Sequence, residues 1–325
     1  MEQQHWQGVF AAITTPFAPD LSVDHSFLAE HASWLVDNGC TGIVALGSLG
    51  ESATLAFDEK VAILETCREG VGDRVPVVAG IAGLSTSECV ALARRAAAAG
   101  CRGLMVLPPY VYRGDWRETE AHFSAVIEAT PLSCMLYNNP IAYGTDVTAD
   151  QLATLVRHDN LHAVKESSGD VRRVTAVFER LGDRLRVFAG LDDMIVESIA
   201  MGAEGWIAGL VNALPAESVA VFELAAAGRW EEARALYDWF LPLLRLDTHP
   251  KFVQYIKLVQ AEVGKGGERV RPPRLEVEGA ERDAVLALVR ARLASRPSVL
   301  READDRGRPA GSRGGSRAAA PITTA

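Results

Sequence analysis

Short apolar runs alternate with amphipathic stretches along the first two thirds of the chain. The runs are rich in β-branched and aromatic side chains, and they predict strands at residues 9–15, 42–46, 75–80, 103–107, 133–137, 163–165, 186–189 and 205–207. Apolar positions recur with a helical period in the stretches between them and predict helices at residues 24–38, 58–70, 86–99, 115–129, 149–157, 171–181, 193–201 and 215–227. Such alternation is typical of βαβ units on a parallel sheet.

Glycines mark the ends of several predicted helices. Gly39, Gly100 and Gly202 each follow a helical stretch at the position of a left-handed cap, and the next strand begins shortly afterwards. The repetition of this unit predicts an α/β fold, namely a single (β/α)8 TIM barrel. A doubly wound sheet is the alternative, but no G-x-G-x-x-G pattern follows the first strand.

The pattern changes after the eighth unit. Residues 229–263 and 280–294 are amphipathic helical stretches with no strands between them. We therefore expect a barrel over residues 1–228 and a C-terminal helical segment over residues 229–296. Residues 297–325 are rich in Arg, Gly, Ser and Ala, which bury too little apolar surface to offset the entropy cost of ordering. This stretch is expected to be a disordered tail.

The amino-acid composition indicates which kinds of partner the protein binds and in which cellular compartment it lies. The 325 residues are 48% hydrophobic, enough for a large core, and the net charge of -9 disfavours nucleic acids and anionic membranes as partners. No apolar run approaches the roughly 18 residues of a membrane span, and the first residues do not resemble a signal peptide. The five cysteines are widely spaced, which favours reduced core thiols in a cytoplasmic protein over disulfides or zinc ligands.

Lys165 is the first candidate for chemistry, because it ends an apolar run and small polar residues follow at once. Barrel enzymes keep their active sites at the carboxyl ends of the strands. An apolar barrel mouth lowers a lysine pKa from about 10.4 toward about 7–8, and the free amine can then form a Schiff base with a carbonyl or imine carbon. The alternative is a lysine that reaches solvent or pairs with Glu166.

Two further features belong to the same expected face of the barrel. Tyr137 ends the preceding strand, and neighbouring strands lie about 4.8 Å apart, so its phenol can relay protons beside Lys165. A buried tyrosine that only needs a hydrogen-bond partner is the alternative. In the loop after the second strand, Gly47 and Gly50 allow backbone N–H groups to converge on an anion and Ser48 adds a hydroxyl, which suits a substrate carboxylate.

Other polar residues carry no metal signature. The seven histidines show no ligand spacing such as H-E-x-x-H, so no metal site is assigned. Asp192 and Asp193 follow the seventh strand and are expected to cap the next helix.

Taken together, these motifs resemble the dihydrodipicolinate synthase and N-acetylneuraminate lyase family of class I Schiff-base enzymes. The resemblance covers residues 6–295. It is carried by Gly8-Val9-Phe10, Thr14-Thr15-Pro16-Phe17, Gly47-x-x-Gly50-Glu51-x-x-x-Leu55, Leu107-Pro108-Pro109-Tyr110, Tyr137-Asn138-x-Pro140, Lys165-Glu166-Ser167-Ser168-Gly169-Asp170 and Ala189-Gly190-x-Asp192-Asp193.

The resemblance implies a barrel with a C-terminal helical segment that assembles as a homotetramer. It implies a small 2-oxo acid or cyclic imino acid as substrate, a covalent Schiff base and no cofactor. Lys165 would form the Schiff base, Tyr137 would transfer protons, and Ser48 would help to hold the substrate carboxylate. Further substrate-binding positions are expected at Gly47, Leu49, Gly50, Tyr110, Asn139, Gly190 and Ile207.

Three positions depart from the synthases of this family. A second loop threonine falls on Leu49, a second tyrosine on Val111 and a carboxylate-binding arginine on Ala142, so none of these positions supplies the expected polar group. Tyr112 would replace the second tyrosine if its loop shifted. The departures point away from condensation with a second carboxylated substrate.

The loops at residues 47–51, 137–144 and 246–251 resemble those of the branch that degrades hydroxyproline. We therefore expect a deaminating hydro-lyase that converts 1-pyrroline-4-hydroxy-2-carboxylate to 2,5-dioxopentanoate and ammonia. One alternative is a class I aldolase, lyase or dehydratase of a 2-oxo acid or sugar acid. The others are 4-hydroxy-tetrahydrodipicolinate synthase and a non-catalytic sensor of 2-oxo acids.

Overall fold

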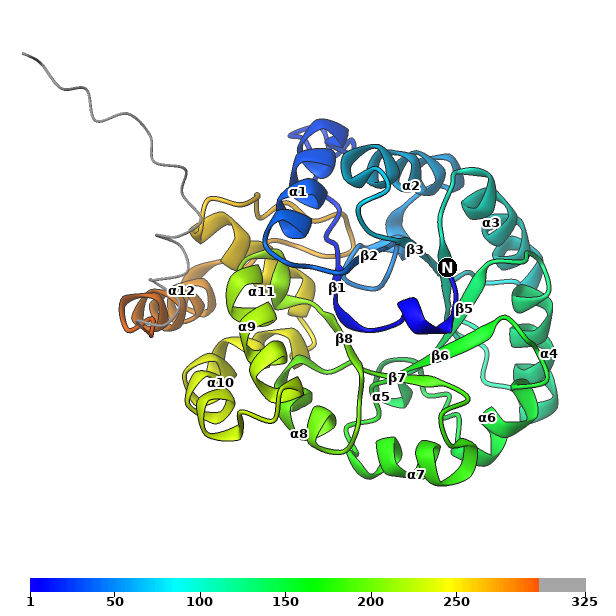
Figure 1. The fold of residues 1–325 in the computed structure, drawn as a ribbon. Helices are drawn as coiled ribbons and strands as arrows, with labels where there is room; N and C mark the ends of the chain where they lie inside the picture. Colours follow the sequence, from blue (N-terminus) through cyan, green and yellow to red (C-terminus); the bar gives the residue numbers. More distant parts are fainter. Residues whose placement is uncertain (298–325) are drawn as a thin grey trace, which may run out of the picture.

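Eight parallel strands form the centre of the protein, in a computed structural model that describes residues 1–297. The strands pair in chain order and the first pairs with the last, so the sheet closes into a barrel (Figure 1). They are β1 (Gly8–Ala12), β2 (Gly42–Ala45), β3 (Val77–Ile81), β4 (Gly103–Val106), β5 (Ser133–Asn138), β6 (Leu161–Glu166), β7 (Arg186–Ala189) and β8 (Gly205–Ala208). The predicted (β/α)8 TIM barrel is confirmed, and the doubly wound alternative is wrong because the sheet closes on itself.

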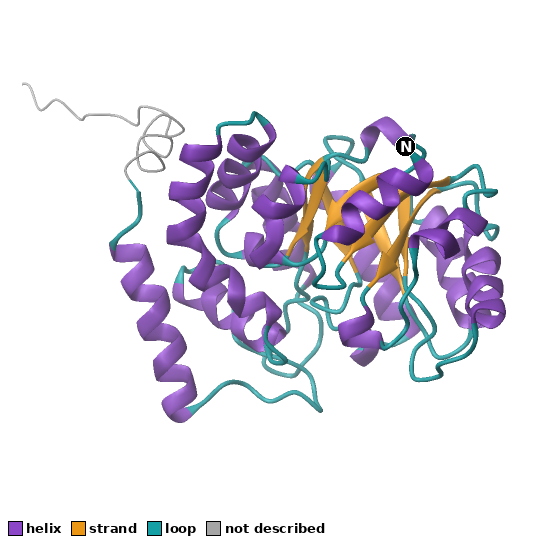
Figure 2. Ribbon diagram, turned by 90° about the horizontal axis from the view of Figure 1, so that it is seen from below, coloured by secondary structure: helices purple, strands orange, loops and turns teal. Residues whose placement is uncertain are grey.

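Helices surround this barrel (Figure 2). Those between or directly after the strands are α1 (His25–Asp37), α2 (Phe57–Val71), α3 (Thr86–Ala98), α4 (Trp116–Ile127), α5 (Pro140–Tyr143), α6 (Ala149–Leu155), α7 (Arg172–Leu181), α8 (Ile195–Ala200) and α9 (Pro215–Ala226). Side chains cap several amino ends, as where Ser85 accepts a hydrogen bond from the backbone N–H of Glu88 in α3. Gly39, Gly100 and Gly202 have positive φ angles, as expected for glycines that end helices.

The sequence did not predict α5, a single turn after β5. It begins at Pro140 and is capped by Asn139, whose side-chain oxygen accepts a hydrogen bond from the N–H of Ala142 at 2.9 Å. The predicted first strand is also too long, because β1 ends at Ala12. The next residues turn into a loop, where the N–H of Thr14 donates to the Asn212 side chain.

Aromatic side chains fill the amino-terminal end of the barrel interior. Trp6 precedes β1, is fully buried and donates a hydrogen bond from Nε1 to Ser133 Oγ at 2.7 Å. Its ring stacks on Phe10 with the centroids 5.7 Å apart, and the edge of Phe188 meets Phe10 at 5.3 Å. Because this end is filled, polar chemistry belongs at the carboxyl ends of the strands, as in other barrels of this type.

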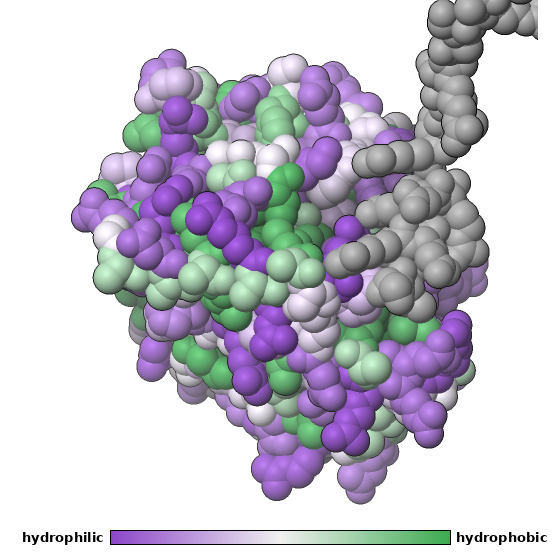
Figure 3. Space-filling model, turned by 90° about the vertical axis from the view of Figure 1, so that its left-hand side faces the viewer, coloured by the Kyte–Doolittle hydropathy of each residue, from purple (hydrophilic) through white to green (hydrophobic). Residues whose placement is uncertain are grey.

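Four elements follow α9 and pack on one side of the barrel: α10 (Trp230–Leu244), the 3-10 turn η5 (Arg245–Thr248), α11 (Phe252–Glu262) and α12 (Gly279–Ala294). The indole N–H of Trp239 in α10 donates to the carbonyl of Arg292 in α12, which ties the two helices together. On the face of these helices shown in Figure 3, hydrophilic residues separate the hydrophobic ones into small patches. The C-terminal helical part of the predicted fold is thus present.

Other expectations concern burial and the end of the chain. All five cysteines are free and buried, in agreement with the prediction of core thiols. None of the helices in residues 1–297 is long and apolar enough to cross a membrane. The predicted disordered tail over residues 297–325 lies, apart from its first residue, outside the residues that the structure describes.

Candidate active site

Lys165 lies inside the barrel at the carboxyl end of β6. The register of the sheet sets it between Tyr137 of β5 and Phe188 of β7, and only 6% of its surface is exposed. Burial lowers the pKa of Lys165 to about 8, and the carboxyl groups of Asp247 and Asp192 oppose this shift. A much larger fraction of this lysine is therefore an uncharged amine near neutral pH than is usual for lysine.

The alternative pairing of Lys165 with Glu166 is not formed. Successive residues of a strand point to opposite faces, and the Glu166 carboxylate accepts hydrogen bonds from the Asn138 side chain at 3.0 Å and the Ser168 N–H at 2.6 Å. These donors hold Glu166 outside the barrel interior. Lys165 is left facing the mouth.

Tyr137 adjoins the lysine, as the order of the strands predicted. The Lys165 ammonium nitrogen lies 4.2 Å from the centroid of the Tyr137 ring. The Tyr137 hydroxyl accepts a hydrogen bond from the side chain of Asn139 at 3.0 Å, and burial raises the pKa of this phenol. Tyr137 is therefore a protonated phenol close to the amine, and Asn139 orients it.

Tyr143, which the sequence analysis did not predict as a site residue, connects Ser48 to Tyr137 and Lys165. The hydroxyls of Ser48 and Tyr143 form a short hydrogen bond. The Tyr143 ring meets the rings of Tyr137 and Tyr110 edge-on, with centroids 5.8 and 5.3 Å away. Burial raises the pKa of both Tyr110 and Tyr143. Tyr143 is the last residue of α5, so the signal for it was the Asn-Pro sequence that starts this turn.

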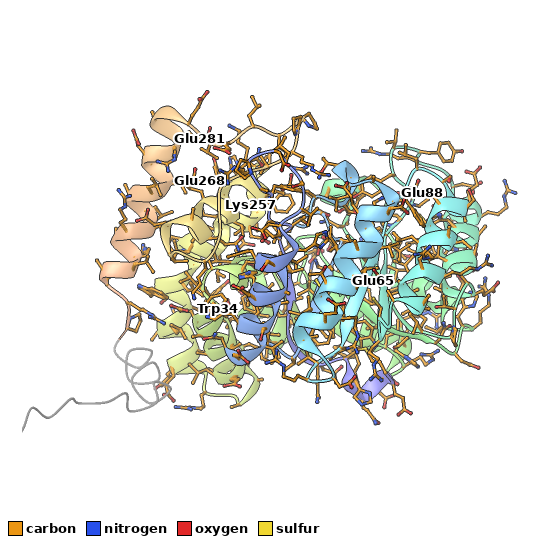
Figure 4. The ribbon with its side chains drawn as sticks, turned by 90° about the horizontal axis from the view of Figure 1, so that it is seen from above. Trp34, Glu65, Glu88, Lys257, Glu268 and Glu281 are labelled. Atoms are coloured by element: carbon orange, nitrogen blue, oxygen red, sulfur yellow. The ribbon has the colours of Figure 1, made fainter. Side chains whose placement is uncertain are left out.

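The loop that carries Ser48 is fastened at its far end. The Thr15 hydroxyl donates to the carbonyl of Gly50 at 2.7 Å. Glu51 has a left-handed backbone, with φ of 56°, and its buried carboxylate accepts hydrogen bonds from the Lys257 ammonium at 2.5 Å and from the N–H of Arg271. Figure 4 shows Lys257 among the side chains of the C-terminal helices. The C-terminal helical part thus holds the loop expected to bind a carboxylate.

Gly190 leaves room for Lys165. A Cβ atom on this residue would lie 1.9 Å from Ser167 Oγ and 2.7 Å from Lys165 Cε, both impossibly close. Its N–H donates to the carbonyl of Glu166 at 2.9 Å. The expected substrate-binding position at Gly190 is therefore next to the lysine and tolerates no side chain.

The remaining expected substrate-binding positions divide into two groups. Gly47 and Gly50 flank Ser48 in the loop, where Leu49 is 4% exposed. Ile207 lies within the barrel interior and belongs to the same buried apolar cluster as Tyr137. Leu49 and Ile207 thus supply apolar surface and no hydrogen-bond donors from their side chains.

Two of the departures from the synthases are exposed, one on the loop after β4 and one in α5. Val111 is 86% exposed, and Ala142 is exposed in α5. Tyr112 does not replace the second tyrosine, because it is 61% exposed and its hydroxyl donates to the Glu118 carboxylate at 3.0 Å. That bond directs Tyr112 toward α4, away from Lys165.

Arg113, which the sequence analysis did not predict as a site residue, reaches the backbone near Ala142 from a neighbouring loop. A Cβ atom on Gly144 would lie 2.1 Å from Cζ of Arg113, so the guanidinium rests on the backbone just after Tyr143. Arg113 follows β4, whereas the expected arginine position is Ala142, two residues before Gly144. The structure thus supplies a cation near the place where the sequence indicated none.

Two carboxyl groups, those of the fully buried Asp192 and the half-buried Asp247, complete the charged groups at the barrel mouth. Asp192 does not cap the next helix, which was the prediction; it accepts hydrogen bonds from the Trp206 indole and the N–H groups of Gly209 and Leu210 at 2.8–3.1 Å. Burial raises the pKa of Asp192 to about 6 and raises that of Asp247 well above its ordinary value. Within residues 1–297, no three side chains of His, Cys, Asp and Glu gather as a metal site.

Comparisons with known proteins agree with this geometry. The family model described as "Dihydrodipicolinate synthetase family" matches residues 5–292. The chain is 32% identical over 289 residues to a 4-hydroxy-tetrahydrodipicolinate synthase of Geotalea uraniireducens, covering 88% of this chain and 98% of that one. It is 36% identical to the protein of the same name from Natronomonas pharaonis, covering 77% and 86% of the two chains.

A solved structure also resembles this one closely. The chloride-inhibited dihydrodipicolinate synthase from Acinetobacter baumannii, complexed with pyruvate, superimposes with a TM-score of 0.83 at 27% sequence identity. The alignment covers 88% of this chain and 98% of that one.

Proposed function

Because the chain belongs to the dihydrodipicolinate synthetase family, we propose that it is a lysine Schiff-base enzyme that acts on a 2-oxo acid or a cyclic imino acid. Enzymes of this family use a covalent lysine Schiff base with pyruvate and no metal cofactor. The observation that carries the proposal is the buried Lys165, with its pKa lowered to about 8 and its nitrogen 4.2 Å from the Tyr137 ring centroid.

The steps follow from the arrangement of these groups. The uncharged amine of Lys165 attacks the C2 carbon of the substrate, and loss of water from a 2-oxo acid leaves a protonated Schiff base that withdraws electrons from C3. Tyr137 receives and returns the protons that these steps move, with Asn139 orienting its hydroxyl. The Ser48 hydroxyl and the backbone N–H groups of its loop hold the C1 carboxylate. Water releases the product and restores Lys165.

The first reaction that we propose is the synthesis of 4-hydroxy-tetrahydrodipicolinate. Relatives that are 32–36% identical over most of their length carry this name. The guanidinium of Arg113 beside Gly144 also supports it, since this cation can receive the carboxylate of a second substrate. One of the three departures that spoke against this reaction, the lack of an arginine at Ala142, is thereby weakened. The hydroxyproline-degrading activity expected from the sequence gains no support from the relatives.

Deamination of 1-pyrroline-4-hydroxy-2-carboxylate remains the second candidate, because one specific observation favours it. Ser48 bonds to Tyr143, while Leu49 and the exposed Val111 supply no hydroxyl group. The hydroxyl groups available for proton transfer are therefore those of Tyr137, Tyr143 and Ser48. We call them the proton relay, and they suffice for proton transfer on a single small molecule.

Two measurements test these proposals. Borohydride reduction in the presence of pyruvate is expected to add one three-carbon unit to the protein at Lys165 and nothing to the Lys165→Ala variant, and equal labelling of both would refute the Schiff-base assignment. Product analysis then separates the reactions. Pyruvate and aspartate semialdehyde yield the cyclic product of the synthase, whereas release of ammonia from the hydroxylated cyclic imino acid identifies the deaminase. Binding of 2-oxo acids with no turnover in either assay would support a sensor.

We also propose that the chain forms a homotetramer in solution, as its resemblance to the family implied. Three large hydrophobic side chains are 61–86% exposed near the carboxyl ends of the strands: Val111 and Tyr112 on the loop after β4, and Ile141 in α5. Contact with a second copy would remove this apolar surface from water. Light scattering coupled to size-exclusion chromatography measures the assembly directly, and a monomer would refute the proposal.

A further inference from the structure

Asp247 brings a carboxyl group from the C-terminal helices to the mouth of the barrel. It lies in η5, between α10 and α11, about 40 residues after the last strand. A Cβ atom on Gly209, the residue that follows β8, would lie 2.0 Å from Asp247 Oδ1 and 2.7 Å from Oδ2. The carboxyl group therefore rests directly on the backbone at the carboxyl end of β8, and any side chain at position 209 would displace it.

The Oδ1 oxygen of Asp247 has no donor. It is shielded from solvent, and no hydrogen-bond partner for it exists among residues 1–297. The neighbouring Asp192 differs, since both of its oxygens accept hydrogen bonds from N–H groups of the loop after β8 and from Trp206. A buried oxygen without a donor carries a desolvation cost that a well-placed ligand group can relieve. Asp192 is thus a structural carboxylate, and Asp247 is an open acceptor.

The pKa shifts of neighbouring groups indicate that the Asp247 carboxyl group lies near Lys165 and Tyr137. The Asp247 carboxyl is close enough to raise the pKa of Lys165 and of Tyr137. Burial and the charge of Asp192 raise its own pKa, and Lys165 opposes that shift. Asp247 therefore stands at the carboxyl end of β8, on the side of the barrel where Lys165 faces the mouth.

We infer that Asp247 selects substrates by accepting a hydrogen bond from a hydroxyl or ammonium group on the part of the substrate beyond its Schiff-base carbon. This inference rests on the proposed function, because the Schiff base to Lys165 fixes where that part of the substrate lies. A methyl group there offers no hydrogen bond, and a second carboxylate at that position is repelled by the acidic pair of Asp247 and Asp192. The substrate class is thus one with a hydroxyl or ammonium donor beyond the Schiff-base carbon. That donor belongs either to a longer 2-oxo or imino acid or to the amino aldehyde that joins pyruvate in the synthase reaction.

Borohydride trapping at Lys165 tests this selection with four probes. They are pyruvate, 2-oxopentanoate, 4-hydroxy-2-oxopentanoate and 2-oxoglutarate, and the concentration that gives half-maximal labelling is measured for each by mass spectrometry. The wild-type protein is expected to reach half-maximal labelling with the hydroxylated acid at about a tenfold lower concentration than with 2-oxopentanoate, the effect of one hydrogen bond to a buried carboxyl group.

Variants assign the preference to Asp247. Asp247→Leu is expected to abolish the preference for the hydroxylated acid over 2-oxopentanoate. The preference is read as the ratio of the two half-maximal concentrations within one variant, because the change in the pKa of Lys165 affects both probes alike. Asp247→Asn removes the charge and is expected to improve labelling by 2-oxoglutarate. Asp238→Asn is the control, because Asp238 lies on α10 with its side chain 65% exposed. Circular dichroism checks that each variant is folded. If Asp247→Leu is not folded, the hydroxyl preference is measured in Asp247→Asn alone.

The outcomes are distinguishable. An unchanged hydroxyl preference in the Asp247 variants, or equal labelling by the hydroxylated and unsubstituted acids in the wild type, would overturn the inference while pyruvate labelling still supported the Schiff base. Absence of pyruvate labelling in the wild type would overturn the proposed function, and this inference with it.

Discussion

The ammonium of Lys257 in α11 lies 2.5 Å from the carboxylate of Glu51, and both side chains are almost completely buried. Lys257 also donates to the carbonyl of Arg269 at 2.7 Å and lies over the Phe17 ring. The pair joins α11 to the loop that carries Ser48. Loss of Glu51 would leave the Lys257 charge buried without its counterion, and loss of Lys257 would leave Glu51 with only the more distant Arg274 guanidinium, 3.9 Å away.

We predict that Lys257→Met lowers the free energy of unfolding by up to about 3–5 kcal/mol, because the Glu51 carboxylate would lose its buried counterion and keep only the more distant Arg274. The freed loop is expected to raise KM for the 2-oxo acid more than it lowers kcat, since Lys165 and Tyr137 belong to β6 and β5 and not to this loop. Chemical denaturation and steady-state kinetics measure the two effects.

A surface pair provides the control for this variant. Lys251 and Glu281 also form an ion pair, at 2.6 Å, but their side chains are 48% and 36% exposed. Lys251→Met is expected to change stability by at most about 1 kcal/mol. Equal losses in the two variants would contradict a special role for the buried pair.

The lowered pKa of Lys165 predicts a pH dependence for Schiff-base formation. Only the uncharged amine attacks the substrate, so the rate of pyruvate labelling is expected to rise with pH and to level off above about 8, the pKa of this lysine. Asp247 raises that pKa by stabilising the ammonium, so Asp247→Asn is expected to shift the profile to lower pH. A wild-type rate that continues to rise toward pH 10 would show that the amine is not the group described.

The sequence predicted the barrel and the pair of Lys165 and Tyr137 because both depend on strand order alone. Neighbouring strands of a parallel barrel bring their carboxyl ends together, whatever the loops do. The sequence did not predict the roles of three other residues, because their positions depend on the paths of loops. Tyr143 lies in one turn of helix, Arg113 on a neighbouring loop and Asp247 in a segment about 40 residues beyond β8. Periodicity does not encode such paths. The preference for deamination gains no support from the relatives. It relied on loop resemblance and on side chains at aligned positions, and neither accounts for a group such as Arg113 that arrives from another loop.

The tyrosines at the mouth are expected to contribute unequally. Tyr137→Phe should lower kcat by about 100-fold or more, because the phenol nearest the amine is lost, and should still allow borohydride labelling with pyruvate. Tyr143→Phe keeps the ring contacts but breaks the bond to Ser48, so a smaller loss, about tenfold, is expected. Kinetics of both variants beside Tyr112→Phe measure this order. A loss in Tyr112→Phe as large as that in Tyr143→Phe would contradict the relay, since Tyr112 bonds to Glu118.

Gly190→Ala tests whether the space around the lysine is required. The added methyl group would lie 1.9 Å from Ser167 Oγ and 2.7 Å from Lys165 Cε, so it must displace one of them. We expect the variant to fold and to lose at least about 100-fold in kcat/KM, because a displacement of about 1 Å at the reacting amine is enough for such a loss. Gly267→Ala is the matched control, since its nearest contact would be 3.9 Å away. Activity near the wild-type level in Gly190→Ala would show that the lysine tolerates displacement and does not perform the covalent step.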